Sequence, residues 1–118
     1  MTDGKQFEVY MGRFFIYQGN RVTFTKAGGD YGADLVIERD GVRTVVQCRQ
    51  RKENTGVDGV QAVNSAKEVY HATRALIVST SEFTKSALNL AKIHNVECWD
   101  GRQLLEELYK HQFFYPPE

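Results

Sequence analysis

Three polar residues, Asp34, Gln47 and Arg49, have the types and spacing of a site that binds a cation and a phosphate. Asp34 follows the glycine-rich stretch 27–32 and opens an apolar stretch, which predicts a strand. A tight turn at residues 40–41 leads into a second strand, whose two-residue period places Gln47 and Arg49 on one face. A carboxylate, an amide oxygen and a guanidinium would then lie side by side. Such a group can hold a hard divalent ion and neutralise an adjacent phosphate.

The same residues also have a purely structural explanation. Asp34 can cap the turn, and Gln47 and Arg49 can be exposed positions on an edge strand. The spacing alone leaves both explanations open.

The elements that position these residues follow from the apolar periodicity. Helices are predicted over residues 5–18, 58–70, 81–95 and 102–110. Strands are predicted over residues 21–25, 33–38, 43–49, 74–79 and 96–99. In this order (αβββαβαβα) the first three strands form an antiparallel meander, and helical connections make the later pairs parallel. We expect an α/β fold with a mixed β-sheet flanked by helices, in which the tail after residue 110 packs on the domain or on a partner.

Composition limits the classes of protein that fit. The 118 residues are 42% apolar and 25% charged, which predicts one globular domain over residues 1–118, with its core over about 6–108 and a short tail over 110–118. The absence of a long apolar run or a signal peptide predicts a cytoplasmic protein without a membrane contact. The two cysteines, Cys48 and Cys98, are expected to be reduced thiols, and the three scattered histidines argue against zinc. A metal would therefore have oxygen ligands.

Charge excludes binding to a polyanion through bulk attraction, because 15 basic residues balance 15 acidic ones. The stretch 39–53 is locally basic, with five basic residues against two acidic ones. This stretch is either a nucleic-acid contact or a solvated strand and loop.

A series of short motifs runs along nearly the whole chain, from residue 6 to residue 108. They are FE at 7–8, GDYGADL at 29–35, VQCR at 46–49, GVDGVQ at 56–61, IVST at 77–80, FT at 83–84 followed by Ala87, and NVECWD at 95–100. In order and spacing they resemble the Mrr-type restriction endonuclease domain, a branch of the PD-(D/E)xK nuclease superfamily. The resemblance implies a restriction-endonuclease-like fold that hydrolyses DNA phosphodiester bonds with Mg²⁺ or Mn²⁺.

The resemblance also implies roles for single residues. Asp34 is similar to the metal-binding aspartate of the family, and Gln47 to the residue that replaces the second acid in this branch. The backbone carbonyl of Cys48 is the expected further metal ligand. Glu8 resembles an early-helix glutamate that joins or supports the metal, although it can equally be an acid that stabilises the start of its helix.

The expected partner is DNA. Arg51 and Lys52 resemble the basic stretch that meets the phosphate backbone, and Gln61 resembles a polar position on the helix beside the cleft, or is a plain surface glutamine. The larger Mrr proteins carry a separate DNA-binding domain that these residues do not include. Target choice would then come from a homodimer surface, a separate DNA-targeting partner or the shape of the nucleic acid.

One residue departs from the family pattern, because Arg49 stands at the position of the catalytic lysine. An arginine can stabilise charge on a phosphate, but it does not release its proton. The leading hypothesis is a metal-dependent DNA endonuclease with Asp34, Gln47 and Arg49 as catalytic residues, weakened in activity by Arg49. The alternative is a catalytically inactive nuclease-fold module that binds DNA or a protein partner. A structural or regulatory α/β module without nucleic acid is the third interpretation.

Overall fold

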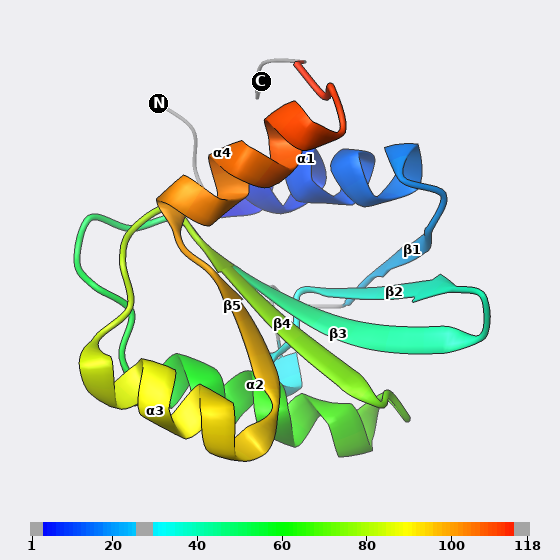
Figure 1. Ribbon diagram of the computed structural model, residues 1–118. Coiled ribbons are helices and arrows are strands. Elements are labelled where there is room, and N and C mark those ends of the chain that lie inside the picture. Colours follow the sequence, from blue (N-terminus) through cyan, green and yellow to red (C-terminus); the bar gives the residue numbers. More distant parts are fainter. Residues whose placement is uncertain (1–3, 26–29, 115–118) are drawn as a thin grey trace.

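The computed structural model describes residues 4–25 and 30–114. Within these residues it contains, in chain order, α1 (Gly4–Tyr17), β1 (Arg21–Phe24), the short 3₁₀ turn η2 (Asp30–Gly32), β2 (Leu35–Arg39), β3 (Val42–Arg49), α2 (Val57–Val69), β4 (Arg74–Ser79), α3 (Lys85–His94), β5 (Val96–Trp99) and α4 (Gly101–Lys110) (Figure 1). The predicted order of helices and strands is confirmed. Residues 27–29 of the predicted glycine-rich turn lie outside the described residues.

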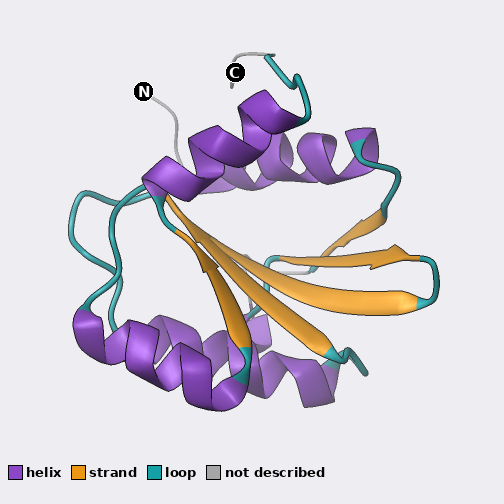
Figure 2. Ribbon diagram, viewed as in Figure 1, coloured by secondary structure: helices purple, strands orange, loops and turns teal. Residues whose placement is uncertain are grey.

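The five strands form one mixed sheet in the order β1-β2-β3-β4-β5. The first three pair antiparallel, and β3, β4 and β5 pair parallel. Helices α1 and α4 cover one face of the sheet, and α2 and α3 cover the other (Figure 2). The predicted α/β architecture with a mixed sheet and helices on both faces is therefore correct.

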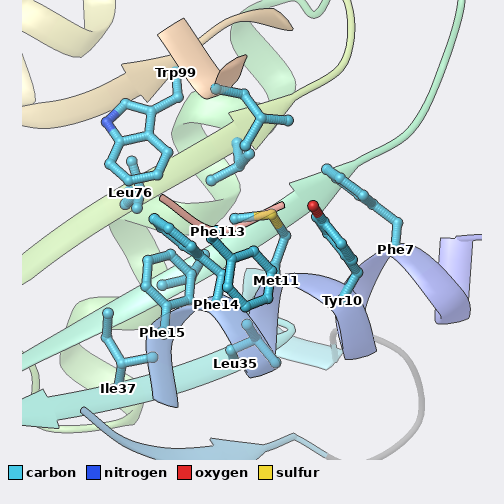
Figure 3. Packing of buried hydrophobic residues seen from close by; sticks show 13 residues of the cluster. Phe7, Tyr10, Met11, Phe14, Phe15, Leu35, Ile37, Leu76, Trp99 and Phe113 are labelled. Carbon is cyan, nitrogen blue, oxygen red and sulfur yellow. The ribbon is translucent and has the colours of Figure 1, made fainter. Parts of the chain in front are cut away.

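Large side chains fill the space between the sheet and the helices α1 and α4. Phe14 is fully buried, and its ring meets those of Phe15, Trp99 and Phe113 at centroid distances of 5.5, 6.4 and 5.4 Å (Figure 3). Because Phe113 is only 4% exposed, this part of the C-terminal segment packs on the domain itself. The buried members of this aromatic layer are Phe7, Tyr10, Met11, Phe14, Phe15, Leu35, Ile37, Val46, Leu76, Val78, Trp99, Leu104 and Phe113.

Smaller side chains fill the opposite layer, beneath α2 and α3. With the exception of Ile77 and Phe83, its buried members are alanine and valine, namely Ala33, Val45, Val60, Val63, Ala66, Ala75, Ala87, Ala91 and Val96. Short side chains let a helix approach the sheet closely. None of the helices in the described part of the chain is long and apolar enough to cross a membrane.

One predicted helix starts later than expected. The apolar pattern predicted a helix from residue 81, but α3 begins at Lys85. The Ser81 N–H donates to the Ser79 hydroxyl, and Thr84 caps the helix by accepting from the Ala87 N–H at 3.1 Å. Residues 82–84 are extended and pair with Thr55, whose N–H donates to the Glu82 carbonyl and whose carbonyl accepts the Thr84 N–H. This pairing keeps them out of the helix.

Candidate functional site

Asp34 immediately precedes β2 and lies beside the carboxyl-terminal end of β3. Its backbone N–H donates to the Val46 carbonyl at 2.8 Å, which continues the ladder set by the Leu35–Val46 pair. Its carboxylate oxygen Oδ2 accepts the next N–H of that ladder, from Cys48, also at 2.8 Å. The side chain thus takes the place of a main-chain partner just where the chain turns away from the sheet. This bond fixes the carboxylate against β3.

The turn before Asp34 packs directly on the backbone of α2. Gly32 has a φ of 87°, and a Cβ built on it would lie 2.2 Å from the Ala62 carbonyl oxygen. No side chain fits at that distance, and the positive φ also favours glycine. Gly32 is therefore required for the close approach that places the turn, and with it Asp34, against α2.

Gln47 bridges this turn and Arg49. Its amide nitrogen donates to the Gly32 carbonyl at 3.2 Å, and its amide oxygen accepts from Arg49 Nε at 3.1 Å. The residue is 8% exposed, and its amide lies beneath Gly59 of α2, where a Cβ would approach the amide oxygen to 3.4 Å. Gln47 thus contacts Arg49 through their side chains, and the Asp34 carboxylate bonds to Cys48, the residue between them. The convergence of the Asp34 carboxylate and the Gln47 amide on one cation stays a prediction.

The predicted alternation along β3 is also confirmed. Val45 packs in the layer under α2 and α3, whereas Val46 and Cys48 pack in the aromatic layer. Cys48 therefore sends its thiol toward α1, while its backbone faces Asp34.

The electrostatics bring Glu8 of α1 into the same group. Asp34 is only 6% exposed, and this burial raises the pKa of its carboxyl group above the ordinary value. The Cys48 N–H, the charge of Arg49 and a hydrogen bond between the Glu8 and Asp34 carboxyl groups each act to lower that pKa. Burial raises the pKa of the Cys48 thiol well above its usual range, and the charges of Asp34 and Glu8 raise it further. At neutral pH the thiol is therefore protonated.

The oxygen atoms of this group fit a hard divalent cation. A cation beside two neighbouring carboxyl groups relieves the repulsion between their negative charges. The Cys48 carbonyl leaves β3 on the same side as the N–H that binds Asp34. In the described part of the chain no three His, Cys, Asp or Glu side chains gather to hold a metal, so a metal here would combine the two acids with a main-chain oxygen.

Three expected DNA-contact residues lie outside this group. Arg51 is held through its backbone, which donates to and accepts from the Thr80 hydroxyl at 3.1 and 3.2 Å. Its side chain is 33% exposed and lies 3.9 Å from Glu53. Lys52 and Gln61 are exposed, the first in the loop after β3 and the second on α2. The structure thus leaves these three side chains at the surface.

Sequence reasoning missed a buried hydroxyl network beside the site. Thr55 and Ser79 are fully buried, their hydroxyl groups lie 3.0 Å apart, and the Ser79 hydroxyl lies 3.0 Å from that of Ser81. The network ties the start of α2 to the carboxyl end of β4, next to Arg49, whose strand partner is Ser79. Its only signal in the sequence was a threonine before α2 and two serines at and after the end of β4, which is too common to be informative.

A comparison with protein families decides the identity of the domain. The Mrr_cat family model, described as "Restriction endonuclease", matches residues 1–108. The chain belongs to this family. The resemblance inferred from the motifs is therefore confirmed, and nucleases with this fold generally use divalent metals.

Solved structures show the same fold. The protein of unknown function AF1548 has a TM-score of 0.78 and 18% identity, covering 97% of this chain and 69% of its own. The DNA modification-dependent restriction endonuclease AspBHI has a TM-score of 0.69 and 16% identity, covering 90% of this chain and 31% of its own. The MspJI restriction endonuclease, in complex with a 27-mer oligonucleotide, has a TM-score of 0.63 and 18% identity, covering 87% of this chain and 27% of its own.

The chain thus spans less than a third of the length of the AspBHI and MspJI structures. At these identities the likeness shows the nuclease fold. No curated protein sequence matches the chain.

Proposed function

We propose that this restriction endonuclease domain is a metal-dependent DNA endonuclease that hydrolyses phosphodiester bonds. The observation that carries the proposal is the buried Asp34 carboxylate, which accepts the Cys48 N–H and contacts Glu8 at the carboxyl end of β3. A buried carboxylate, next to a second, partly exposed acid and a guanidinium, suits a site that binds a cation and a phosphate together. MspJI, which has this fold, was solved with an oligonucleotide, and this supports DNA as the partner.

Asp34, Glu8 and the Cys48 carbonyl would hold Mg²⁺ or Mn²⁺ through oxygen. When bound, such an ion lowers the pKa of a water molecule and polarises the phosphate. Gln47, the other metal ligand that the resemblance predicts, is left out of this set because its amide oxygen already accepts a hydrogen bond from Arg49.

Arg49 would act through its fixed charge. A guanidinium is not a general base, so we do not assign Arg49 the proton of an attacking water. It can stabilise the negative charge that gathers on the phosphate during attack. We therefore place Arg49 at the phosphate, and we assign the proton of the attacking water to the solvent.

Arg51, Lys52 and Gln61 would contact the DNA backbone around this centre. Their exposure leaves them accessible, and backbone contacts of this kind position DNA without reading its sequence. A homodimer or a separate targeting partner would then choose the target. The cytoplasmic location also stays a prediction.

A plasmid cleavage assay with Mg²⁺ or Mn²⁺ tests the proposal. We expect cleavage that requires the added metal and that falls by at least about 10²-fold in Asp34→Ala, because this variant loses the central ligand. Asp40→Ala is the matched control, since Asp40 lies in the exposed hairpin turn and should cut like the unmodified chain. A folded chain that binds metal and DNA yet leaves the plasmid intact would contradict the proposal.

A binding module without turnover is the second candidate, and Arg49 at the position of the family lysine favours it. Under both candidates, replacing Arg51 and Lys52 by alanine should reduce the slope of log affinity against log salt by about 2, because two phosphate contacts are lost. Replacing the exposed Lys92 and Lys110 is the matched control, with the same change in charge. The two candidates then differ in cleavage alone.

A further inference from the structure

We infer that Gln47 is a positioning residue, which orients Arg49 toward the phosphate, and that it is not a metal ligand. The inference rests on the proposed function for the role of Arg49, but the contact on which it depends exists in the free protein. Gln47 accepts from Arg49 Nε at 3.1 Å and donates to the Gly32 carbonyl at 3.2 Å.

These two partners fix which way the amide faces. The Gly32 carbonyl can only accept and the Arg49 Nε–H can only donate. If the amide were rotated by half a turn, an NH₂ group would face a guanidinium and an oxygen would face a carbonyl. Both contacts would be repulsive, so only one orientation of Gln47 satisfies its neighbours.

The surroundings of Gln47 hold this orientation from three sides. Its backbone pairs with Ile77 of β4, and the residue is 8% exposed. Gly59 of α2 lies over its oxygen, and Gly32 is itself fixed by contact with the Ala62 carbonyl. A side chain held in one rotamer by rigid elements can orient a neighbour without a further loss of entropy on binding.

The consequence for Arg49 is a defined direction of its guanidinium. Because Nε donates a hydrogen bond to Gln47, the two terminal nitrogens of Arg49 are the ones that can meet a phosphate. Arginine commonly binds phosphate through two parallel hydrogen bonds of this kind. Arg49 is half-buried, so this edge is both restrained and accessible.

The same contact argues against a metal on Gln47. A cation at the amide oxygen would lie next to the positive charge that already occupies this position, and the two would repel each other. The oxygen could become a ligand only if Arg49 moved away. The acid pair of Asp34 and Glu8, by contrast, gains from a cation.

The first test uses the chain without metal or DNA, and it follows the Arg49 Nε–H signal by NMR, assigned through its loss in Arg49→Ala. We expect a signal protected from solvent exchange in the unmodified chain and unprotected in Gln47→Ala. Gln47→Glu should restore the protection in part, because one carboxylate oxygen still accepts from Nε while the other loses the bond to the Gly32 carbonyl. Gln18→Ala, at the far end of α1, is the matched control and should leave the signal unchanged.

The second test measures Mn²⁺ binding by calorimetry. We expect the affinity to change by less than about threefold in Gln47→Ala, whereas loss of a true ligand would weaken it by about tenfold or more. A tenfold weaker affinity together with an unchanged Arg49 signal would overturn the inference. If Gln47→Ala does not fold, Gln47→Glu decides alone, since a ligand at this position would bind Mn²⁺ about tenfold more tightly as a carboxylate.

If the chain cleaves DNA, the double variant Gln47→Ala with Arg49→Ala should be no slower than Arg49→Ala alone, within about threefold. Residues that act as one unit show this loss of additivity. Independent effects that multiply would overturn the inference. If the chain binds DNA without cutting it, the proposed function fails, and the NMR and Mn²⁺ measurements still decide the role of Gln47.

Discussion

The two faces of the sheet are built from different side chains, and the difference separates stability from positioning. Under α1 and α4 the layer contains Phe7, Phe14, Phe15, Trp99 and Phe113, whereas under α2 and α3 it is mainly alanine and valine. Aromatic side chains bury large areas and dominate the energy of a core. Small side chains and glycines contribute less, but they bring a helix backbone close enough to contact a turn.

The candidate site depends on both layers in different ways. The layer of small side chains beneath α2 and α3, called the thin layer below, determines the backbone geometry around the site. Within it Gly32 touches the Ala62 carbonyl and Gly59 lies over Gln47. The aromatic layer holds α1 and therefore Glu8. A change in the aromatic layer should thus affect mainly stability, and a change in the thin layer should affect the site as well.

The largest loss of stability is expected from the aromatic layer. Phe14→Ala should lower the free energy of unfolding by about 3–5 kcal/mol, because a fully buried ring leaves a cavity. Val63→Ala, at an equally buried position in the thin layer, should cost about 2 kcal/mol. Urea unfolding of both variants measures the difference. Equal losses would show that the two layers do not differ as proposed.

A smaller loss, with a larger effect on the site, is expected at Gly32. Gly32→Ala should cost about 2–3 kcal/mol, because its Cβ would collide with the Ala62 carbonyl in a backbone of positive φ. Gly41→Ala is the matched control, since its φ is 79° but its Cβ would meet open space, and it should cost about 1–2 kcal/mol. Only the Gly32 variant should also weaken Mn²⁺ binding. A Gly41 variant that is equally impaired in Mn²⁺ binding would contradict the role of the contact with α2.

The smallest expected effect is a gain of stability in the variant Asp34→Asn. Burial raises the pKa of this carboxyl group in the folded chain, so the folded state holds the proton more tightly than the unfolded state. The stability that this provides is present at acidic pH and is lost as pH rises through the folded pKa. Asp34→Asn avoids that loss and its side-chain oxygen can still accept the Cys48 N–H, so it should melt higher than the unmodified chain at about pH 8 and almost equally at about pH 4.

Adding a divalent metal gives a second way to compare Asp34→Asn with the unmodified chain. Mn²⁺ should raise the melting temperature of the unmodified chain at about pH 8, because it binds only the folded state, and it should have little effect on Asp34→Asn. Thermal unfolding with the metal and with a chelator measures both effects. A gap between the two proteins that stayed constant over the pH range would show that ionised Asp34 does not destabilise the free chain.

Most of the fold could be predicted from sequence, since the elements are short and their periodicity is clear. The tight turn at residues 40–41 fixed the register of β2 and β3, so the neighbourhood of Asp34 and Gln47 followed from strand geometry. The late start of α3 could not be predicted, because it depends on the pairing of residues 82–84 with Thr55, which is distant in the sequence.

The inner contacts of the site could not be predicted either. The partner of the Asp34 carboxylate is a backbone N–H, which every residue except proline has, so no residue type marks it. Glu8 was placed near the site by resemblance alone, and its contact with Asp34 depends on how α1 packs on the sheet. The orientation of Gln47 depends on Gly32 and Arg49 together, and it is defined only once the turn is packed on α2.

The buried ring of Phe113 has a consequence for where this domain can be cut or joined to another protein. The family match ends at residue 108, but Phe113 lies against Tyr10 and Phe14 at centroid distances of 5.5 and 5.4 Å. A truncation at the family boundary would expose these rings to water. The smallest autonomous unit must therefore extend through Phe113, and a fusion partner belongs beyond Phe114, whose side chain is exposed.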